Sequence, residues 1–291
     1  MFMVSYEKGK LSQNTLVIRK KTTALPPVLI KKIPSKRPKE ERPVIQVKNL
    51  VKKYDDTFAV NKISFEVKKG EIFGILGPNG AGKTTTLEII ETILSKTEGK
   101  VLVDGLDIDI YQNQIKSLIG IQLQTAGFYP NLTLVEQLEL FADIYNVNIK
   151  PLAVLKTVNL VDKAKSRVDQ LSGGQKQRFS IATTLVADPT IIFLDEPTTG
   201  LDPQARRNLW EMILDLKKKG KTIVLTTHYM DEAEQLCDRV AIMDAGKILE
   251  INTAENFIKE LLARGFKKEQ STLGASLEDV FLDLTGKNWR D

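Results

Sequence analysis

The sequence predicts an α/β fold with a mainly parallel β-sheet, and three observations lead to this prediction. Short apolar runs typical of buried strands occur at residues 72–76, 191–194, 222–227 and 240–243. Helical patterns at 203–219 and 230–236 separate the last three runs, and strands that alternate with helices form parallel sheets. The first run passes through a glycine loop into a helix expected at 83–94, which is the order that a phosphate-binding loop requires.

Further elements are expected between these strands and before them. The runs 44–47 and 63–67 alternate or nearly alternate between apolar and polar residues, as half-buried strands do. Residues 133–145 have apolar positions at helical spacing, and 152–161 continue this character. Because this block lies between segments of sheet-like sequence, we expect a mostly helical insertion over about 125–187.

The last third of the chain is expected to end the sheet with a turn, a strand and a helix. The pair Ala245-Gly246 is a turn signal, and it leads into a strand at 247–251 and a helix over about 253–264. We therefore expect one compact unit over 44–264, followed by a tail over 265–291.

Residues 1–43 differ from the rest in proline content and in charge. They contain five prolines and carry a net charge of +8, whereas the whole chain carries +5 and residues 44–291 carry −3. We expect a basic, extended arm. It is either a solvated tail, or the product of an early start codon, or an arm that lies on a partner or on acidic lipid headgroups. The net negative charge of residues 44–291 argues against nucleic-acid binding by this part of the chain.

Membrane and cysteine signals are weak. The apolar runs fall far short of the ~20 residues of a membrane helix, and no apolar stretch suited to a signal peptide follows the first charges. We expect a cytosolic chain that reaches a membrane only through a partner. Cys237 is the only cysteine and its neighbours offer no metal-ligand spacing, which favours a buried small residue.

The segment Gly77 to Thr84 reads GPNGAGKT. Its glycines leave room for backbone amides to surround a β-phosphate, and the helix that follows adds the positive end of its dipole. The positive charge of Lys83 is suited to contact the β- and γ-phosphates, and the Thr84 hydroxyl is suited to ligate Mg²⁺. The loop alone leaves the activity open, because kinases, GTPases and motors share it.

A second motif, IIFLDEP at 191–197, is an apolar strand that ends in two carboxylates. Unpaired carboxylates are costly in a core, so we expect them at the edge of the sheet. Asp195 is suited to hold Mg²⁺ through a water, and Glu196 to orient or deprotonate an attacking water. Acidic strand ends also serve as helix caps, but Pro197 follows here at once.

His228 is the only histidine, and it follows the apolar run 222–227 directly. A lone histidine is commonly structural. The expected strand before it should run parallel to the one that ends at Asp195, so His228 is also placed to reach a γ-phosphate.

A further glycine-rich segment, LSGGQKQR at 171–178, raises the question of why one chain needs two phosphate cradles. Together the motifs resemble the ATP-binding subunit of ABC transporters over about residues 44–291. The family's Walker A matches GPNGAGKT, its Walker B matches IIFLDE, and its signature matches LSGGQKQR without a substitution. The D-loop falls on Gly200-Leu201-Asp202, the switch histidine on His228, the Q-loop glutamine on Gln124 in IGIQLQ, and the adenine-stacking aromatic on Tyr54.

The resemblance implies an ABC ATPase fold, a P-loop NTPase core with a mainly parallel sheet, an N-terminal antiparallel β-subdomain and a helical insertion. It implies ATP and Mg²⁺ as cofactors. It places nucleotide contacts at Tyr54, Gly77, Pro78, Asn79, Gly80, Ala81, Gly82, Lys83, Thr84, Thr85, Leu171, Ser172, Gly173, Gly174, Gln175 and Asp202. It assigns catalytic roles to Lys83, Gln124, Glu196 and His228, and Mg²⁺ ligation to Thr84, Gln124 and Asp195.

The resemblance also answers the question of the two cradles. In the family two subunits, a homodimer or close paralogues, stack head to tail. Each ATP then lies between one subunit's phosphate loop and the other's signature, where Ser172 and the amides of Gly173 and Gly174 would contact the γ-phosphate.

The segments 227–248 and 276–286 are similar to the exporter branch of the family, which moves drugs, antibiotics, polysaccharides or lipids, or extrudes ions. We therefore expect export through a separate transmembrane permease, with this chain at the cytoplasmic face of the membrane. The chain departs from the branch where Asn252-Thr253-Ala254 replaces Gly-Thr-Pro, and Gln122, two residues before Gln124, leaves a second register for the Q-loop.

The alternative is a soluble ABC ATPase that acts on ribosomes or DNA. Ribosome-acting members resemble two fused domains, and this chain has one signature. DNA-repair members carry coiled coils or zinc-binding cysteines, and residues 85–190 contain neither. A third possibility, a regulator that only binds ATP, is disfavoured by the intact Glu196 and His228. We expect no nucleic-acid partner.

Overall fold

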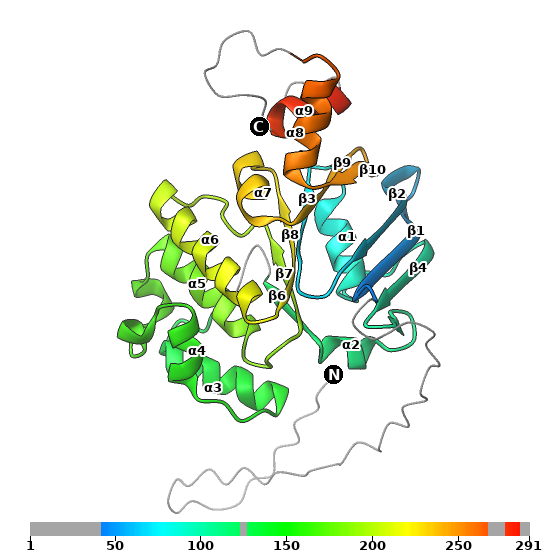
Figure 1. Cartoon of the computed structure of the whole chain (residues 1–291). Coiled ribbons are helices and arrows are strands. Elements are labelled where there is room, and N and C mark those ends of the chain that lie inside the picture. The colour runs from blue at the N-terminus through cyan, green and yellow to red at the C-terminus, as the bar shows by residue number, and fades with distance from the viewer. Residues whose placement is uncertain (1–41, 123–126, 267–276, 286–291) are drawn as a thin grey trace, which may run out of the picture. The chain divides into compact units, whose positions relative to one another are not determined.

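The central element of the fold is a six-stranded sheet, and the carboxyl ends of its parallel strands lie at one edge. The computed structural model describes residues 42–122, 127–266 and 277–285, all within the unit 37–291 (Figure 1). The strand order is β10-β9-β3-β8-β7-β6. β3, β6, β7, β8 and β9 pair in parallel, and β10 pairs with β9 in antiparallel. The strands are β3 (Ile72–Leu76), β6 (Ile119–Gln122), β7 (Ile191–Asp195), β8 (Thr222–Thr227), β9 (Arg239–Asp244) and β10 (Lys247–Asn252).

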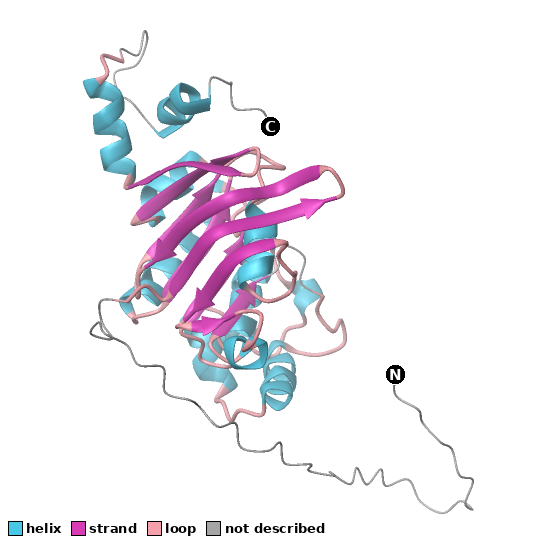
Figure 2. Cartoon of the chain, turned by 90° about the vertical axis from the view of Figure 1, so that its right-hand side faces the viewer, coloured by secondary structure: helices cyan, strands magenta, loops and turns pink. Residues whose placement is uncertain are grey.

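A second, antiparallel sheet has the strand order β2-β1-β4-β5 (Figure 2). Its strands are β1 (Ile45–Tyr54), β2 (Thr57–Val67), β4 (Glu98–Val103) and β5 (Leu106–Asp107). The predicted α/β fold with a mainly parallel sheet and an antiparallel β-subdomain is confirmed. The sequence patterns do not predict β4, β5 and β6. β4 pairs with β1, the two-residue β5 pairs with β4, and β6 pairs with β7.

Capping residues and left-handed turns set the ends of several helices. Thr133 and Glu136 form a reciprocal capping box at the start of α3, and Asn146 (φ 53°) ends it in the left-handed conformation. α1 ends four residues earlier than predicted, and Thr92 (φ 64°) leaves the helical conformation just beyond its end. The helices are α1 (Lys83–Ile90), α2 (Gln112–Lys116), α3 (Leu134–Tyr145), α4 (Pro151–Thr157), α5 (Gly173–Thr184), α6 (Pro203–Lys218), α7 (Met230–Leu236), α8 (Ala254–Ala263) and α9 (Leu277–Thr285), with 3₁₀ turns at Val161–Lys163 and Val168–Gln170.

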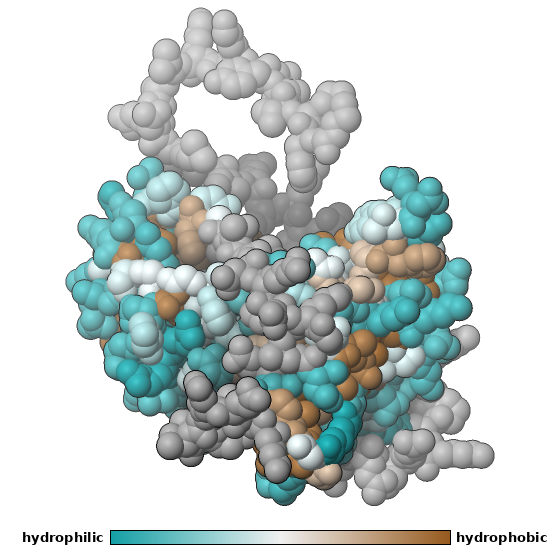
Figure 3. All heavy atoms as spheres, turned by 90° about the horizontal axis from the view of Figure 1, so that it is seen from above, coloured by the Kyte–Doolittle hydropathy of each residue, from teal (hydrophilic) through white to brown (hydrophobic). Residues whose placement is uncertain are grey.

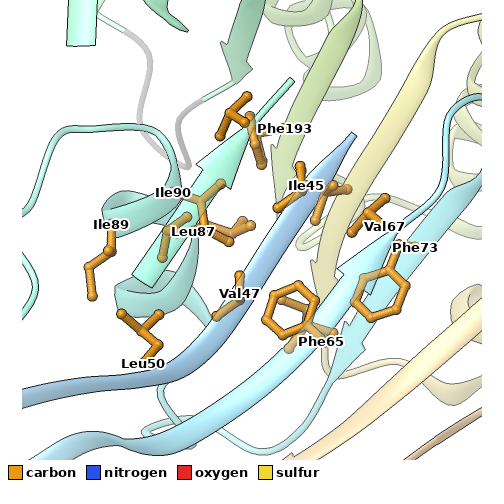
Figure 4. Packing of buried hydrophobic residues seen from close by; sticks show 14 of the residues in the cluster. Ile45, Val47, Leu50, Phe65, Val67, Phe73, Leu87, Ile89, Ile90 and Phe193 are labelled. Atoms are coloured by element: carbon orange, nitrogen blue, oxygen red, sulfur yellow. The ribbon is translucent and has the colours of Figure 1, made fainter. Parts of the chain in front are cut away.

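The alternation of side chains along β3 distributes them between separate cores. Phe73 packs with apolar residues of the antiparallel sheet and of α1, which lies between the two sheets (Figures 1 and 4). Its ring stacks on Phe65 with 5.2 Å between the ring centroids. Ile72 instead packs on the opposite face, against residues of α3 to α6. This two-sided burial explains why β3 reads as a continuous apolar run.

A third core joins the C-terminal helices to the sheet. Leu277, Val280 and Phe281 of α9 pack with residues of α7, α8 and β9. The backbone N–H of Leu277 donates to Glu234 Oε1 at 2.6 Å. Cys237 is half-buried beside this core, which agrees in part with the expected small buried residue. An ideal Cβ on Gly74 of β3 would lie 2.6 Å from the Cys237 sulfur, so the glycine makes room for it.

The face seen in Figure 3 is mostly hydrophilic where its residues are described, and hydrophobic side chains emerge in small groups. Within the described ranges, none of the helices combines the length and the apolar character that crossing a bilayer requires.

Candidate nucleotide site

The phosphate loop is fitted tightly against neighbouring backbone. Gly82 has φ 98°, and an ideal Cβ there would lie 2.3 Å from the carbonyl oxygen of Ala59. A Cβ on Gly77 would lie 2.2 Å from the carbonyl oxygen of Met243. Both positions therefore require glycine, because a side chain would collide with fixed backbone atoms. Because these glycines have no side chain, the loop can also bring its amides close to a ligand.

Lys83 begins α1 and folds back over this loop. Its Nζ donates to the carbonyl oxygens of Gly77 at 2.9 Å and Pro78 at 3.1 Å. It also lies 3.3 Å from Glu196 Oε1, and Lys83 is only 5% exposed. A compact, buried positive charge is thus held at the mouth of the loop, directly beside the carboxylate that follows β7.

Glu196 is held in an uncommon backbone conformation, with φ 47°. Its N–H donates to Thr226 Oγ1 at 3.0 Å and to the Thr226 carbonyl oxygen at 3.2 Å. These bonds attach the residue to β8 and aim its side chain at Lys83.

The Glu196 carboxylate is the meeting point of two basic side chains. His228 Nδ1 lies 3.2 Å from Glu196 Oε2, within ion-pair distance, although the two atoms are not aligned as a hydrogen bond requires. Burial opposes ionisation of Glu196, but the charges of Lys83 and His228 outweigh it and lower the pKa of this carboxyl below its usual value. The group is therefore ionised at neutral pH and can accept a proton or a hydrogen bond.

Thr84 and Asp195 form an oxygen-rich pair suited to Mg²⁺. Thr84 Oγ1 lies 3.2 Å from Asp195 Oδ1 and 3.1 Å from Oδ2, and the Thr226 hydroxyl also donates to Asp195 Oδ1. Mg²⁺ is commonly bound by one or two protein oxygens together with phosphates and waters, so this donor set fits the ion. Clusters of three or more His, Cys, Asp or Glu suited to a metal are not found among the described residues.

A pocket of about 350 Å³ opens over these groups. Its lining includes Asn79, Gly80, Gly82, Lys83, Thr84, Thr85 and Glu196, all of them predicted site residues, and adds Ala59 from β2. Tyr54 is 47% exposed at the end of β1, on the same hairpin as Ala59, but it does not line the pocket. The remaining loop positions, Gly77, Pro78 and Ala81, form the turn beneath Lys83.

Gln124 lies outside the described residues. The last described residue before it, Gln122 at the end of β6, pairs with Leu194 of β7. Gln122 itself is buried, with 2% exposure.

The second glycine cradle lies in a separate pocket of about 210 Å³, whose lining includes Ser172, Gly174, Gln175 and Asp202. Ser172 caps α5 and forms a reciprocal box with Gln175, with donor-acceptor distances of 3.3 Å and 2.9 Å. Asp202 caps α6, where its side chain accepts from the backbone N–H groups of Gln204 and Ala205. Gly173 precedes Gly174 in the first turn of α5, and Leu171 is buried at 5% exposure. This pocket and the phosphate-loop pocket have no described lining residue in common.

Three residues of the site region are missing from the sequence-based prediction. Thr226 anchors both Asp195 and Glu196, Ala59 lines the phosphate-loop pocket, and Glu91 is a buried carboxyl at the end of α1. Burial, reinforced by the negative charges of Asp195 and Glu88, raises the pKa of Glu91 to about 8. Only the polar Thr226, inside an apolar strand, offered a sequence signal.

Comparisons with known proteins point in one direction. A family model described as "ABC transporter" matches residues 60–199. "Nod factor export ATP-binding protein I" of Burkholderia orbicola is 40% identical over 210 residues, which cover 70% of this chain and 68% of that protein. "Linearmycin resistance ATP-binding protein LnrL" of Bacillus subtilis is 38% identical over 223 residues, or 75% of this chain and 72% of that protein.

A solved structure described as the dimeric post-hydrolysis state of an ATP-binding cassette with ADP and Pi is also similar. It is 30% identical, has a TM-score of 0.65, and the match covers 72% of this chain and 98% of that chain. The agreement extends over nearly the whole of that cassette, so the predicted fold is confirmed at the level of the family.

We expect Glu91 to make stability fall as the pH rises. The unfolded carboxyl loses its proton near its usual pKa of 4.5, whereas the folded one keeps it until about 8. The free energy of unfolding should therefore decrease between these pH values, by on the order of 4 kcal/mol at about pH 7.5. Glu91→Gln should remove most of this dependence, which denaturant unfolding without nucleotide at several pH values would reveal. The exposed Glu139→Gln is the matched control, and parallel pH curves for wild type and Glu91→Gln would contradict the prediction.

Proposed function

The chain belongs to the ABC transporter family as an ATP-hydrolysing subunit, and we propose that it drives export through a separate transmembrane permease from the cytoplasmic face of the membrane. The direction is supported by the two relatives above, one of which is named for Nod factor export and the other for linearmycin resistance. The similarity of residues 227–248 to exporters supports the same direction. ABC ATPase subunits of transporters work with membrane components and form dimers. For this chain, we propose a transmembrane permease and a second ATPase subunit as the two partners.

The observation that carries the proposed chemistry is the meeting of charges at the ends of β3, β7 and β8. Lys83 would neutralise charge on the β- and γ-phosphates of ATP, which is favourable because its own surroundings are already shielded from water. ATP would give Lys83 a second anionic partner beside Glu196. The resemblance assigns Gln124 to the same site, as a sensor of the γ-phosphate.

We propose that Glu196 orients the attacking water and accepts its proton. The lowered pKa of Glu196 supports the orienting part of this role, because an ionised carboxylate accepts a hydrogen bond from water and does not donate one. His228, 3.2 Å away, would share the task of positioning water and γ-phosphate. Thr84 and Asp195 would hold Mg²⁺, which supplies charge stabilisation to the phosphates when bound.

We propose that the two pockets are complementary halves of sites shared by two subunits, either identical chains or close paralogues. Ser172 sits at the amino end of α5, where free amides and the helix dipole favour an anion. Its pocket is separate from the phosphate-loop pocket of the same chain, so a γ-phosphate bound by Lys83 needs the signature of another subunit. Dimerisation is then part of the chemistry, and hydrolysis releases the partner.

Glu196→Gln should bind ATP with Mg²⁺, hydrolyse it at least about a hundredfold more slowly and accumulate as a dimer, because the water loses its acceptor. Phosphate release measures the rate, and size-exclusion chromatography with light scattering measures the dimer. Glu139→Gln, the same change on the exposed face of α3, should behave like wild type. A Glu196→Gln chain that stays monomeric at saturating ATP and turns over like wild type would refute the assigned role.

Ser172→Arg should leave ATP binding to the monomer intact and abolish turnover, because the larger side chain blocks the shared interface. In the Glu196→Gln background it should also prevent the ATP-dependent dimer. ATP affinity measured by calorimetry and the oligomeric state together test this expectation, with the exposed Ser117→Arg as control. Loss of ATP binding by the Ser172→Arg monomer would instead place the signature in its own chain's site.

Purification of the full chain from its native membranes should yield a stoichiometric partner with several apolar segments of about 20 residues. Sequencing of that partner and of any nucleic acid present tests the transport proposal. Bound rRNA or DNA in place of a membrane protein would favour a soluble ABC ATPase that acts on ribosomes or DNA.

A further inference from the structure

The ring of Tyr229 contacts two other side chains. The centroid of the His228 ring lies 4.1 Å from that of Tyr229, with an interplanar angle of 42°. The guanidinium carbon of Arg206 in α6 lies 4.5 Å from the centre of the tyrosine ring. The Tyr229 backbone is fixed as well, because its N–H donates to Thr227 Oγ1 at 2.9 Å.

His228 depends on such packing for its orientation. Nδ1 is a buried atom without a hydrogen-bond partner of good geometry among the described residues, although Glu196 Oε2 is 3.2 Å away. A histidine ring is commonly oriented by a hydrogen bond to one of its nitrogens. The Tyr229 ring, by contrast, lies directly against the imidazole.

Arg206 is itself held in place over the tyrosine. Its Nη1 forms an ion pair with Asp231 Oδ2 at 3.2 Å, and its side chain is only 22% exposed. Its backbone N–H donates to the carbonyl oxygen of Asp202, the cap of α6, at 3.0 Å. Guanidinium groups stack well on aromatic faces because charge and planar shape both match the ring.

A second contact keeps α6 and α7 in register around this stack. Trp210 Nε1 donates to Glu232 Oε1 at 3.1 Å. Trp210 lies four residues after Arg206 in α6, and Glu232 lies three residues after Tyr229 in α7. The N-terminal turns of α6 also contribute Asp202 and Ala205 to the signature pocket. One helix therefore touches both the proposed partner-facing pocket and the stack that ends at His228.

We propose that Arg206 and Tyr229 are positioning residues for ATP hydrolysis, which hold the His228 ring toward Glu196 and tie its orientation to helix α6. The inference rests on the proposed role of His228 in hydrolysis. Arg206 and Tyr229 do not contact the nucleotide in this scheme. They act on the rate of the chemical step through His228, so ATP affinity is independent of them.

Steady-state ATPase kinetics and ATP affinity of the full chain test this inference. Tyr229→Ala should lower kcat about tenfold and Arg206→Ala about fivefold, as expected for the loss of ring packing and of one cation–π contact, with ATP affinity unchanged. Tyr229→Phe keeps the ring and should restore most of the activity. Arg207→Ala, which removes the same charge from the next and exposed position of α6, should behave like wild type.

The decisive comparison uses a second background. If Tyr229 acts through His228, then Tyr229→Ala should cause no further loss of kcat in a His228→Ala chain. An undiminished additional loss there, or a Tyr229→Ala chain with wild-type kcat, would overturn the inference while leaving the proposed function intact. A His228→Ala chain with wild-type kcat would overturn both the role of His228 and the inference. Melting temperatures check folding, and should Tyr229→Ala not fold, Arg206→Ala is combined with His228→Ala in its place.

Discussion

The parallel pairing of β3, β8 and β7 is the constraint on which the rest of the site depends. Leu76 pairs with Thr227, and Thr226 pairs with Asp195, so the three strands end at one level. The residues that follow these ends belong to segments far apart in the sequence, yet they meet within hydrogen-bonding distance. A slip by one residue would move every side chain of a strand to the opposite face.

Buried charge at this edge is costly and is therefore informative about function. A buried ion pair such as Lys83–Glu196, at 3.3 Å, contributes little net stability because both ions lose hydration. The fold nevertheless holds Glu196 in a left-handed conformation and attaches it to Thr226 by two backbone hydrogen bonds. Strain and desolvation concentrated at one position are typical of a site shaped for catalysis.

The two glycine cradles of this chain have different physical designs. The phosphate loop is pressed against distant backbone at Ala59 and Met243, and therefore depends on tertiary structure for its shape. The signature is a helix start whose capping box, Ser172 with Gln175, is complete within four residues. In the proposed dimer, this helix start, which lines a pocket of its own, would recognise a ligand carried by another subunit.

Much of the fold and of the site was predictable because it is encoded in short segments. The glycines of the phosphate loop, the apolar strand that ends in Asp195 and Glu196, and the cap at Ser172 each specify local structure without reference to the rest of the chain. The boundaries of α3 follow from its own capping residues in the same way.

Tertiary structure alone decided which residues support these segments. The partnership of Thr226 with Asp195 joins residues 31 positions apart, and the position of Ala59 depends on how the antiparallel sheet packs over α1. The raised pKa of Glu91 arises from burial beside Asp195, and the stack of Arg206 on Tyr229 from the packing of α6 against α7. The sequence by itself determined which chemical groups are available and where the strands and helices of the strongest patterns lie, such as β3, β7 and α3. Their distances, burial and charges were set by long-range packing, because these properties belong to pairs of residues and not to any single segment.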